Sequence, residues 1–366
     1  MSFIRPFRGL RPIPGKAADV LSAPYEHCRE THRRALRRDC SPGYYAYQLE
    51  ADSHTQTGLV FAASLQAYRE KRIKRHELTR PHKETDHLGY LESLGAQTAP
   101  AMLVYPPAAH VDELLAEMTA VSPETVVRCP KGVTHRVWPI VDADGVERLT
   151  RAFDALPALY IADGHHRLAA ADRAAQARRS RAPSDRASGA WEGFLAVAFP
   201  HHAMKIMNYN RVVSSLNGMS EDEFLDRVCD RFSTSVSQGP VLPTNSREFG
   251  LYLPGRWFRL KLLKECVSSE HPLARLDVNV LTEHLLKPIL AIADLGDDRR
   301  IDFVGGNLGA AELERRVAAG MAAAFVLQAA RMDDLIGVAE RGEVMPPKST
   351  WFEPKVADGL VSYLVE

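Results

Sequence analysis

Near the middle of the chain, residues 160–167 read Tyr160-Ile161-Ala162-Asp163-Gly164-His165-His166-Arg167. The apolar run that ends at Ala162 predicts a short buried strand, and the Ala/Arg-rich residues 165–179 have high helix propensity. Asp163 is therefore expected to be the N-cap of this helix, and Gly164 permits close approach of the backbone to a ligand. Because N–H groups at a helix N-terminus attract anions, the motif indicates a phosphate site.

Three side chains of the first helical turn add to this anion site. His165, His166 and Arg167 supply hydrogen-bond donors, and a guanidinium group matches the geometry of a phosphate. Asp163 is available to hold a metal ion or to orient a substrate group. A structural Asp-Gly turn with basic neighbours is the alternative interpretation. A metal site made from both histidines is disfavoured, because neighbouring helical residues point about 100° apart.

A second polar cluster comes earlier in the chain. Residues 73–79 read IKRHELT and are followed by Pro81, His82, Lys83 and Glu84. Basic, acidic and hydroxyl groups gathered after an apolar strand candidate are typical of an active-site loop. A solvated charged face has the same composition, so both interpretations stay open at this point.

A third motif lies near the C-terminus, where residues 342–355 read GEVMPPKSTWFEPK. The Lys-Ser-Thr run resembles the end of a P-loop, but the upstream glycine spacing is absent and Pro346-Pro347 precludes that loop. We therefore reject a Walker A motif. A rigid loop that presents Lys348, Ser349 and Thr350 to an anion remains the functional interpretation.

Composition limits the classes of function. The chain has 366 residues, and its 46 Lys+Arg and 46 Asp+Glu give a formal net charge of zero. This balance argues against a protein that acts mainly through phosphate-backbone contacts with nucleic acid. The 5 cysteines form no C-x-x-C pair, and we find neither a signal peptide nor an apolar run long enough for a membrane helix. We expect a cytoplasmic protein.

Strand and helix signals alternate along the chain, which predicts a mixed α/β (α/β or α+β) fold with two domains, 1–200 and 201–366. Four local expectations are specific. A helix should cover 26–38, a turn should form at 142–145, a helix with a capping box should follow Ser220, and one helix should run from Val278 to Ile292.

Several motifs together resemble the DUF1015 family of bacterial and archaeal proteins. The resemblance runs nearly from end to end and is carried by residues 5–12 (RPFRGLRP), 23–25 (APY), 56–58 (QTG), 73–79, 83–84, 160–167, 276–278 (LDV), 289–290 (IL) and 342–355. The chain departs from the family pattern at Glu26, where the family commonly has Asp. It departs again at Asn210, where the family tends to have His before Arg211.

The Asp-Gly-His-His-Arg element also resembles the phosphate-binding motif of the ParB/sulfiredoxin superfamily, which includes CTP-binding partition proteins, sulfiredoxins and free L-serine kinases. The resemblance implies a ParB/sulfiredoxin-like nucleotide-binding catalytic domain over 1–200 and a second α/β domain over 201–366 whose final loop returns to the site. It also implies a kinase that transfers a phosphoryl group from ATP or ADP, with Mg²⁺, to a small hydroxyl substrate, foremost free L-serine.

The resemblance implies the roles, because in free serine kinases a glutamate upstream of the motif serves as base and the motif holds the nucleotide phosphates. Phosphoryl transfer needs cations on the phosphates, a metal ion and a base aimed at the hydroxyl. Glu77 is expected to be the base, and Asp163 to orient the metal or the hydroxyl. His76 and Thr79 are assigned to the substrate. Phosphate binding is assigned to Gly164, His165, His166, Arg167, Lys83, Lys348, Ser349 and Thr350. The expected partners are a nucleotide and a small substrate; a homodimer is allowed, and nucleic acid and membrane are not expected.

Three other functions fit parts of the sequence. A nucleotide-binding regulatory module of the partition-protein kind would lack kinase activity, but we see no basic DNA-reading helix. A sulfiredoxin-like reductase needs a reactive cysteine near the motif, and Cys129 stands in no recognisable context. A ligase or nucleotidase is the third alternative.

Overall fold

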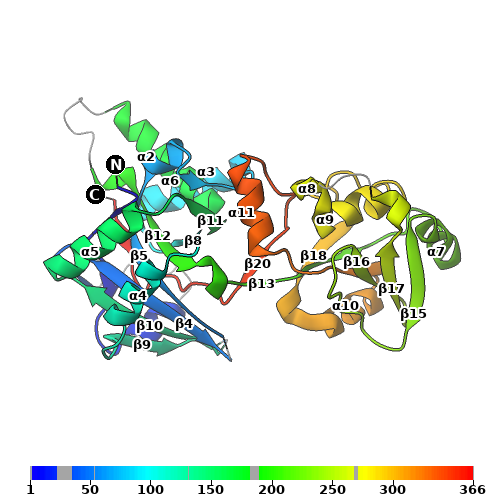
Figure 1. Ribbon diagram of the computed structural model, residues 1–366, viewed down its shortest axis with the longest axis horizontal. Coiled ribbons are helices and arrows are strands. Elements are labelled where there is room, and N and C mark those ends of the chain that lie inside the picture. Colours follow the sequence, from blue (N-terminus) through cyan, green and yellow to red (C-terminus); the bar gives the residue numbers. More distant parts are fainter. Residues whose placement is uncertain are drawn as a thin grey trace. The chain divides into compact units, whose positions relative to one another are not determined.

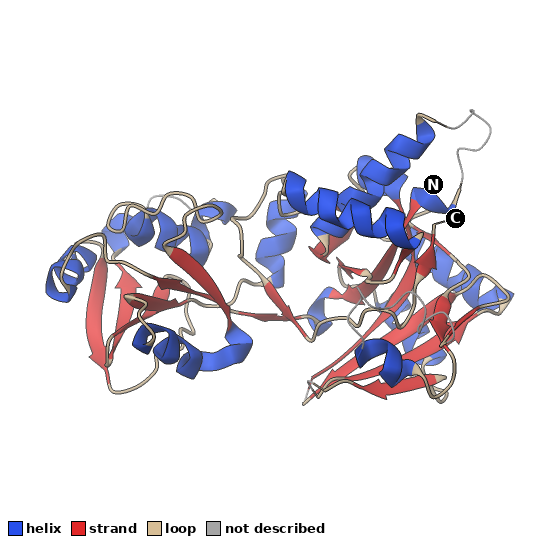
Figure 2. Ribbon diagram, turned by 180° about the vertical axis from the view of Figure 1, so that it is seen from behind, coloured by secondary structure: helices blue, strands red, loops and turns tan. Residues whose placement is uncertain are grey.

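The computed structural model describes residues 2–22, 35–52, 54–130, 132–181, 189–267 and 271–365. The chain divides into two compact units (Figures 1 and 2). Unit 1 comprises Met1–Met204 and Pro354–Glu366, and unit 2 comprises Lys205–Glu353. The sequence had assigned all of 201–366 to the second domain, whereas the last residues from Pro354 onward belong to unit 1. The motif at 23–25, Glu26 and most of the helix expected at 26–38 lie outside the described residues. The described end of that expected helix is wrong, because residues 36–38 form a strand that pairs with residues 10–12.

Unit 1 alternates strands and short helices. Its elements are β1 (Ile4–Arg5), β2 (Leu10–Pro12), α1 (Ala17–Ser22), β3 (Leu36–Arg38), β4 (Tyr44–Ala51), β5 (His54–Ser64), α2 (Leu65–Arg69), β6 (Ile73–Lys74), α3 (Pro81–Leu94), β7 (Ala96–Gln97), β8 (Ala101–Tyr105), α4 (Ala109–Met118), β9 (Thr125–Arg128), β10 (Thr134–Ile140), α5 (Ala143–Asp154), β11 (Leu159–Asp163), α6 (His165–Arg179), η3 (Ala190–Glu192), β12 (Gly193–Pro200), η4 (His201–Ala203) and β21 (Tyr363–Leu364).

A nine-stranded mixed sheet organises unit 1, in the order β6-β11-β8-β12-β5-β4-β10-β9, with β1 added to β5. Most neighbours are antiparallel, but β6 runs parallel to β11, and β12 runs parallel to β8. The alternation of strands and helices confirms the predicted mixed α/β class. The parallel pair β6–β11 matters most for the candidate site. Because the two strands run in the same direction, the segments that follow them begin at the same end of the strands.

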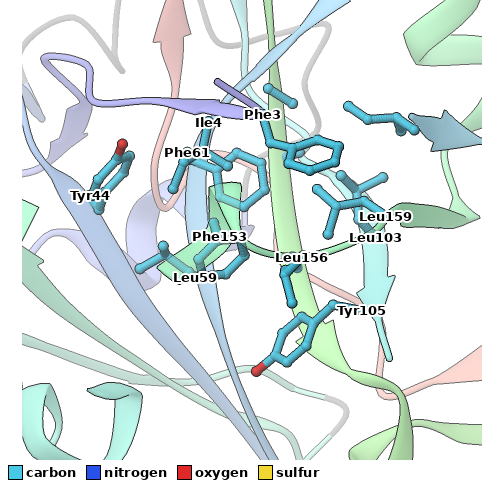
Figure 3. Packing of buried hydrophobic residues seen from close by; sticks show 14 of the residues in the cluster. Phe3, Ile4, Tyr44, Leu59, Phe61, Leu103, Tyr105, Phe153, Leu156 and Leu159 are labelled. Atoms are coloured by element: carbon cyan, nitrogen blue, oxygen red, sulfur yellow. The ribbon is translucent and has the colours of Figure 1, made fainter. Parts of the chain in front are cut away.

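The core of unit 1 forms where the sheet meets its helices. Figure 3 shows Phe3, Phe61, Phe153 and Tyr105 packed with aliphatic side chains of β5, β8 and β11. Phe153 contacts two of the other aromatic rings edge-on, with ring centroids 5.5 Å from Phe61 and 5.7 Å from Tyr105. Such pairs add to the stabilisation that burial of the rings already provides.

The turn expected at 142–145 is wrong, because helix α5 begins there. Asp142 is its N-cap, and its carboxylate accepts a hydrogen bond from the Gly145 N–H at 2.7 Å. Leu149 and Phe153, four residues apart, lie on the buried face of the helix. The Asp-x-x-Gly sequence is therefore a helix start, and the apolar spacing after it was the signal that sequence reasoning missed.

The last residues of the chain are part of unit 1. β21 pairs with β7 in antiparallel register, and Ser362 bridges to Leu10. The family motif at residues 5–12 contributes to the same region, where the buried Arg11 guanidinium pairs with Asp39 at 2.7 Å and with Glu124 at 2.8 Å. These motif residues therefore have a clear structural role.

Unit 2 is built on a separate, fully antiparallel sheet of order β15-β17-β16-β19-β14-β18. Its elements are β13 (Lys205–Met207), β14 (Tyr209–Val213), α7 (Glu221–Cys229), β15 (Phe232–Ser237), β16 (Glu248–Leu253), β17 (Arg256–Leu262), η5 (Lys264–Cys266), α8 (Pro272–Arg275), α9 (Asp277–Leu281), η6 (Thr282–Leu286), β18 (Ile301–Gly305), η7 (Gly306–Leu308), α10 (Gly309–Ala318), β19 (Ala323–Val326), α11 (Met332–Glu340) and β20 (Trp351–Glu353). Leu313 and Val317 of α10 pack with Val212, Trp257 and Val326 of the sheet.

Two sequence expectations fall in unit 2. The capping box at Ser220 is confirmed, because its hydroxyl accepts from the Glu223 N–H while the Glu223 carboxylate accepts from the Ser220 N–H. The single helix from Val278 to Ile292 is wrong: α9 ends at Leu281 and continues as a π-helical turn to Leu286. There the Thr282 hydroxyl donates to the Val278 carbonyl at 2.6 Å, and the Lys287 N–H donates to Thr282 instead of to Glu283. Within the described part of the chain, no helix is long and apolar enough to span a membrane.

Candidate functional site

The parallel pairing of β6 and β11 brings the first two sequence motifs together. Leu159 pairs with Ile73, and Tyr160 pairs with Lys74, so the chain leaves the two strands side by side. His76 and Glu77 follow β6, and Asp163 and Gly164 end β11. Carboxyl ends of adjacent parallel strands are where α/β folds commonly bind ligands. The structure thus joins two segments that are about 85 residues apart in the chain.

Gly164 makes the sharp turn from β11 into α6. It is the N-cap of α6, with φ of 97°, and Asp163 is the last residue of the strand. The expected N-cap role of Asp163 is therefore wrong. A Cβ at Gly164 would lie 2.9 Å from a guanidinium nitrogen of Arg167 and 3.1 Å from the Cα of Ala101. Backbone geometry and space both require glycine here, because L-residues rarely adopt this φ.

Two buried histidines and one carboxylate form a cluster beneath this turn. His76 is 1% exposed and His165 is 6% exposed, and their rings meet edge-on with centroids 4.6 Å apart. Ligand atoms of His76, Glu77 and His165 all lie within 4.8 Å of one another. Both ring nitrogens of His76 are buried without a hydrogen-bond partner among the described residues.

Burial sets the charge of the two rings. It lowers the pKa of His76 to about 4. Burial, followed by the nearby His76 ring, lowers the pKa of His165 well below its ordinary value. Both rings are therefore neutral at pH 7. The side chain of His165, which was assigned to phosphate, is buried against His76, whereas the side chains of His166 and Arg167 are partly exposed.

The donor atoms at the site suit two different kinds of cation. Mg²⁺ prefers oxygen ligands and is usually held by one or two carboxylates together with substrate phosphates, a role that the half-buried Asp163 carboxylate fits. Two neutral imidazoles with one carboxylate are instead the ligands that Zn²⁺ and other transition ions prefer. Glu77 belongs to the second set, which does not include Asp163.

Asp163 lies between two cations. Its Oδ2 is 3.3 Å from Lys355 Nζ and 3.7 Å from a guanidinium nitrogen of Arg167. Burial alone raises the pKa of this carboxyl, but Lys355 and then Arg167 outweigh burial and hold the pKa below its usual value. Asp163 is therefore ionised at neutral pH. Lys355 stands in the C-terminal motif, but it was not among the predicted site residues, because only the tertiary structure brings it to Asp163.

Helix α3 supplies the other charged groups near the turn, and it packs along α6. Burial, followed by electrostatic repulsion from His87 and Lys83, lowers the pKa of His166. The Thr79 hydroxyl donates to Glu84, which also pairs with Arg173 of α6 at 3.3 Å. Thr79, assigned to the substrate, thus helps to hold α3 on α6.

The predicted residues of the third motif lie in unit 2. The Ser349 hydroxyl is buried and donates to the Pro346 carbonyl at 2.7 Å, and the Lys348 backbone has φ of 60°. The buried Arg211 guanidinium donates to the Lys348 carbonyl at 3.1 Å. Asn210, where the family tends to have histidine, accepts a hydrogen bond from Asn208 at 2.8 Å. The anion-binding role of Lys348, Ser349 and Thr350 stays a prediction.

These features define a mixed α/β protein in which Gly164 makes a sharp turn from a strand into a helix. The turn is flanked by Lys355, Arg167, Lys83 and His166, and it adjoins the cluster of His76, Glu77 and His165. A family model described as "Protein of unknown function (DUF1015)" matches residues 31–279, and the chain belongs to this family. The expected resemblance to the DUF1015 family is thereby confirmed over residues 31–279. A search of curated protein sequences gave no significant match.

Several solved structures resemble the chain. One is a free serine kinase in complex with AMP, with a TM-score of 0.39 and 12% identity over 83% of this chain and 92% of that chain. Another is a conserved hypothetical protein from Pyrococcus furiosus, with a TM-score of 0.37 and 13% identity over 82% and 93%. A third is SbnI with a C-terminal truncation from Staphylococcus aureus, with a TM-score of 0.43 and 9% identity over 82% and 85%.

Proposed function

We propose that the protein is a nucleotide-dependent kinase that phosphorylates the hydroxyl of a small molecule, with free L-serine as the first candidate acceptor. One observation carries the proposal: the parallel strands β6 and β11 deliver the Glu77 carboxylate and the Gly164–Arg167 turn to the same sheet edge. A base and a phosphate-binding turn side by side are the two parts that phosphoryl transfer needs. The choice of serine rests on the motif resemblance to free L-serine kinases.

In the proposed reaction, Glu77 accepts the proton of the substrate hydroxyl as its oxygen attacks the terminal phosphorus of ATP or ADP. The phosphorus–oxygen bond to the leaving nucleotide breaks, and ADP or AMP departs. Backbone N–H groups of the first turn of α6, with Arg167, His166 and Lys83, bind the phosphates. Bound Mg²⁺ would neutralise charge on the transferred group, with Asp163 as its protein ligand.

The remaining assignments complete the proposal. His76 and Thr79 border the acceptor, and His165 supports the turn from beneath while its backbone N–H faces the phosphates. Lys348, Ser349 and Thr350 are proposed as further phosphate-binding residues. Residues 1–200 would form the catalytic, ParB/sulfiredoxin-like domain, completed by the C-terminal return that carries Lys355.

The direct test is to incubate the purified protein with ATP or ADP, Mg²⁺ and a panel of amino acids and sugars, and to follow phosphorylated products by phosphorus NMR. A new phosphomonoester signal that requires both nucleotide and acceptor supports the kinase. Nucleotide binding without transfer to any acceptor would contradict it and would instead favour a regulatory nucleotide-binding module.

Lys355→Ala should weaken nucleotide binding about fivefold, because it removes a partly exposed cation beside Asp163. A loss of this size lies between the effect of losing a solvent-screened ion pair and the effect of losing a buried hydrogen bond to a charged group. Isothermal titration calorimetry with ADP and Mg²⁺ measures the change. Lys16→Ala is the matched control, since Lys16 is an exposed lysine that pairs with Asp19, three residues along the chain, at 2.8 Å. Equal affinities for the Lys355 variant and the wild type would remove Lys355 from the nucleotide site.

Zn²⁺ is expected to inhibit phosphoryl transfer reversibly, because binding to His76, His165 and Glu77 would occupy the proposed base. Competition with a chromophoric chelator measures Zn²⁺ affinity without any activity assay. His76→Ala should lower that affinity by more than the roughly 10- to 100-fold that loss of an outer-shell partner costs, because His76 would be a direct ligand. His110→Ala is the control, because His110 lies on α4 and contacts the Ala152 carbonyl. Zn²⁺ affinity unchanged by His76→Ala would show that the ion binds elsewhere.

A further inference from the structure

Unit 2 contains a cavity of about 360 Å³, and Ser349 is the one residue of its lining that the kinase proposal also uses. It lies where β19 ends and β16 begins, and it is closed by residues of α9 and α11. Its charged and polar lining includes Arg247, Arg275, Asp277, Arg331, Asp334 and Ser349. This volume is within the range of small-molecule sites in proteins.

Two motifs singled out in the sequence meet at this cavity. Leu276, Asp277 and Val278 line it from the segment that begins α9, and Met345 and Ser349 line it from the C-terminal motif. The two motifs are about 70 residues apart in the chain. The first of them has no place in the phosphoryl-transfer proposal.

Asp277 offers an unused acceptor at the cavity. Its Oδ1 accepts from the Arg247 N–H at 2.8 Å and from the Ser246 hydroxyl at 3.1 Å. Its Oδ2 is buried and has no hydrogen-bond partner within the described part of the chain. A buried carboxylate oxygen that accepts no hydrogen bond raises the free energy of the folded protein. A ligand that brings a hydrogen-bond donor to this oxygen would therefore be stabilised there.

The charge of Asp277 suits a cationic donor. Burial raises the pKa of its carboxyl to about 6, although the hydrogen bonds from Arg247 and Ser246 oppose the shift. The carboxylate is thus ionised at neutral pH. Asp334 adds a second negative charge to the lining, while the guanidinium groups of Arg247, Arg275 and Arg331 add three positive ones.

A ligand that carries one positive and one negative charge would complement this lining. Guanidinium groups bind carboxylates through paired hydrogen bonds, and Asp277 Oδ2 would accept from an ammonium group. A simple phosphate would place a second anion beside the Asp277 carboxylate, and like charges at close range repel. A nucleotide base would find no aromatic side chain in the lining, whose apolar part is Leu276, Val278, Ala329, Ala330 and Met345.

We propose that unit 2 binds a free α-amino acid in this cavity, with its ammonium group on Asp277 and its carboxylate on the arginine side. The site is separate from the catalytic assignments in unit 1 and does not depend on them. It would make the chain responsive to an amino acid whether or not the protein is a kinase.

The test measures amino-acid binding to the full chain in the absence of nucleotide. Each of the standard amino acids is screened by thermal shift, and the strongest is titrated by calorimetry beside propionate and ethylamine, which each carry one of the two charges. We expect an amino acid to raise Tm and both single-charge compounds to fail. L-Alanine is informative because it has no hydroxyl to phosphorylate.

Asp277→Asn should weaken the binding of that amino acid about tenfold or more, since the amide nitrogen would face the ammonium group. The variant can fold, because asparagine keeps the oxygen that accepts from Arg247 and Ser246. Arg275→Gln changes an exposed side chain and should weaken binding too, whereas Arg315→Gln on α10 should not. These measurements keep the site testable if Asp277→Asn proves unstable.

Three outcomes would overturn the proposal: no amino acid raises Tm, propionate or ethylamine binds as well as the amino acid, or both Asp277→Asn and Arg275→Gln retain full affinity. The Glu77→Gln variant distinguishes amino-acid binding at this cavity from the proposed kinase activity. The variant should keep full binding at the unit 2 cavity, even if phosphoryl transfer is lost or was never present.

Discussion

Glu77→Gln should lower the rate of phosphoryl transfer by about 10²- to 10⁴-fold, the usual contribution of a general base. The amide is nearly the same size as the carboxylate but cannot accept the proton of the substrate hydroxyl. Nucleotide affinity should stay close to that of the wild type, because the phosphates are assigned to the turn at Gly164 and not to Glu77. Rates from phosphorus NMR and ADP affinities from calorimetry measure the two effects separately.

Glu92→Gln is the matched control for this experiment. Glu92 is an exposed glutamate on α3, so its substitution should change neither rate nor affinity. The assignment of Glu77 as the base is wrong if affinity for ADP collapses in Glu77→Gln while turnover per bound nucleotide is kept. That pattern would make Glu77 part of the nucleotide site.

Gly164→Ala is expected to destabilise unit 1 by about 1–3 kcal/mol and to weaken nucleotide binding strongly. The new Cβ would meet a backbone atom of Ala101 at 3.1 Å, and an L-residue would have to hold a φ of 97°. Relief of that strain turns the first N–H groups of α6 away from their present direction. Urea unfolding measures the loss of stability, and calorimetry with ADP measures the loss of affinity.

Gly89→Ala serves as the control for Gly164→Ala. Gly89 lies inside α3, and a Cβ there would have nothing within 4 Å. Alanine should therefore leave binding unchanged and raise stability by about 0.5–1 kcal/mol, from helix propensity alone. A Gly164→Ala variant that is as stable as wild type and binds ADP normally would show that the turn tolerates a side chain and is not the phosphate site.

Local sequence determined the pieces of the candidate site. The apolar run to Ala162, the glycine and the alanine-rich segment after it specify a strand, a sharp turn and a helix, because each preference depends on residues within one or two turns. The capping box at Ser220 is local for the same reason. The motifs were also specific enough to identify the family that the family model over residues 31–279 confirmed.

Local rules failed where two of them competed or where burial decided. Asp142-Ala143-Asp144-Gly145 satisfies both a turn and a helix N-terminus, and burial of Leu149 and Phe153 selected the helix. Asp163 has the side chain of an N-cap, but the positive φ of Gly164 moved the cap one residue onward. No propensity predicts the π-helical turn after Leu281, which depends on how the helix is packed.

Only the tertiary structure decided which residues meet. Short-range pattern in the chain identifies β11 as a strand, but strand β6 and its parallel pairing with β11, which puts Glu77 beside Gly164, depend on long-range contacts in the sheet. The return of the C-terminus that sets Lys355 against Asp163, and the cavity that joins Asp277 to Ser349, are long-range in the same way. Contacts between residues so far apart in the chain depend on the free energy of the whole packed unit. A local stretch of sequence contributes only part of that free energy, so it does not determine these contacts by itself.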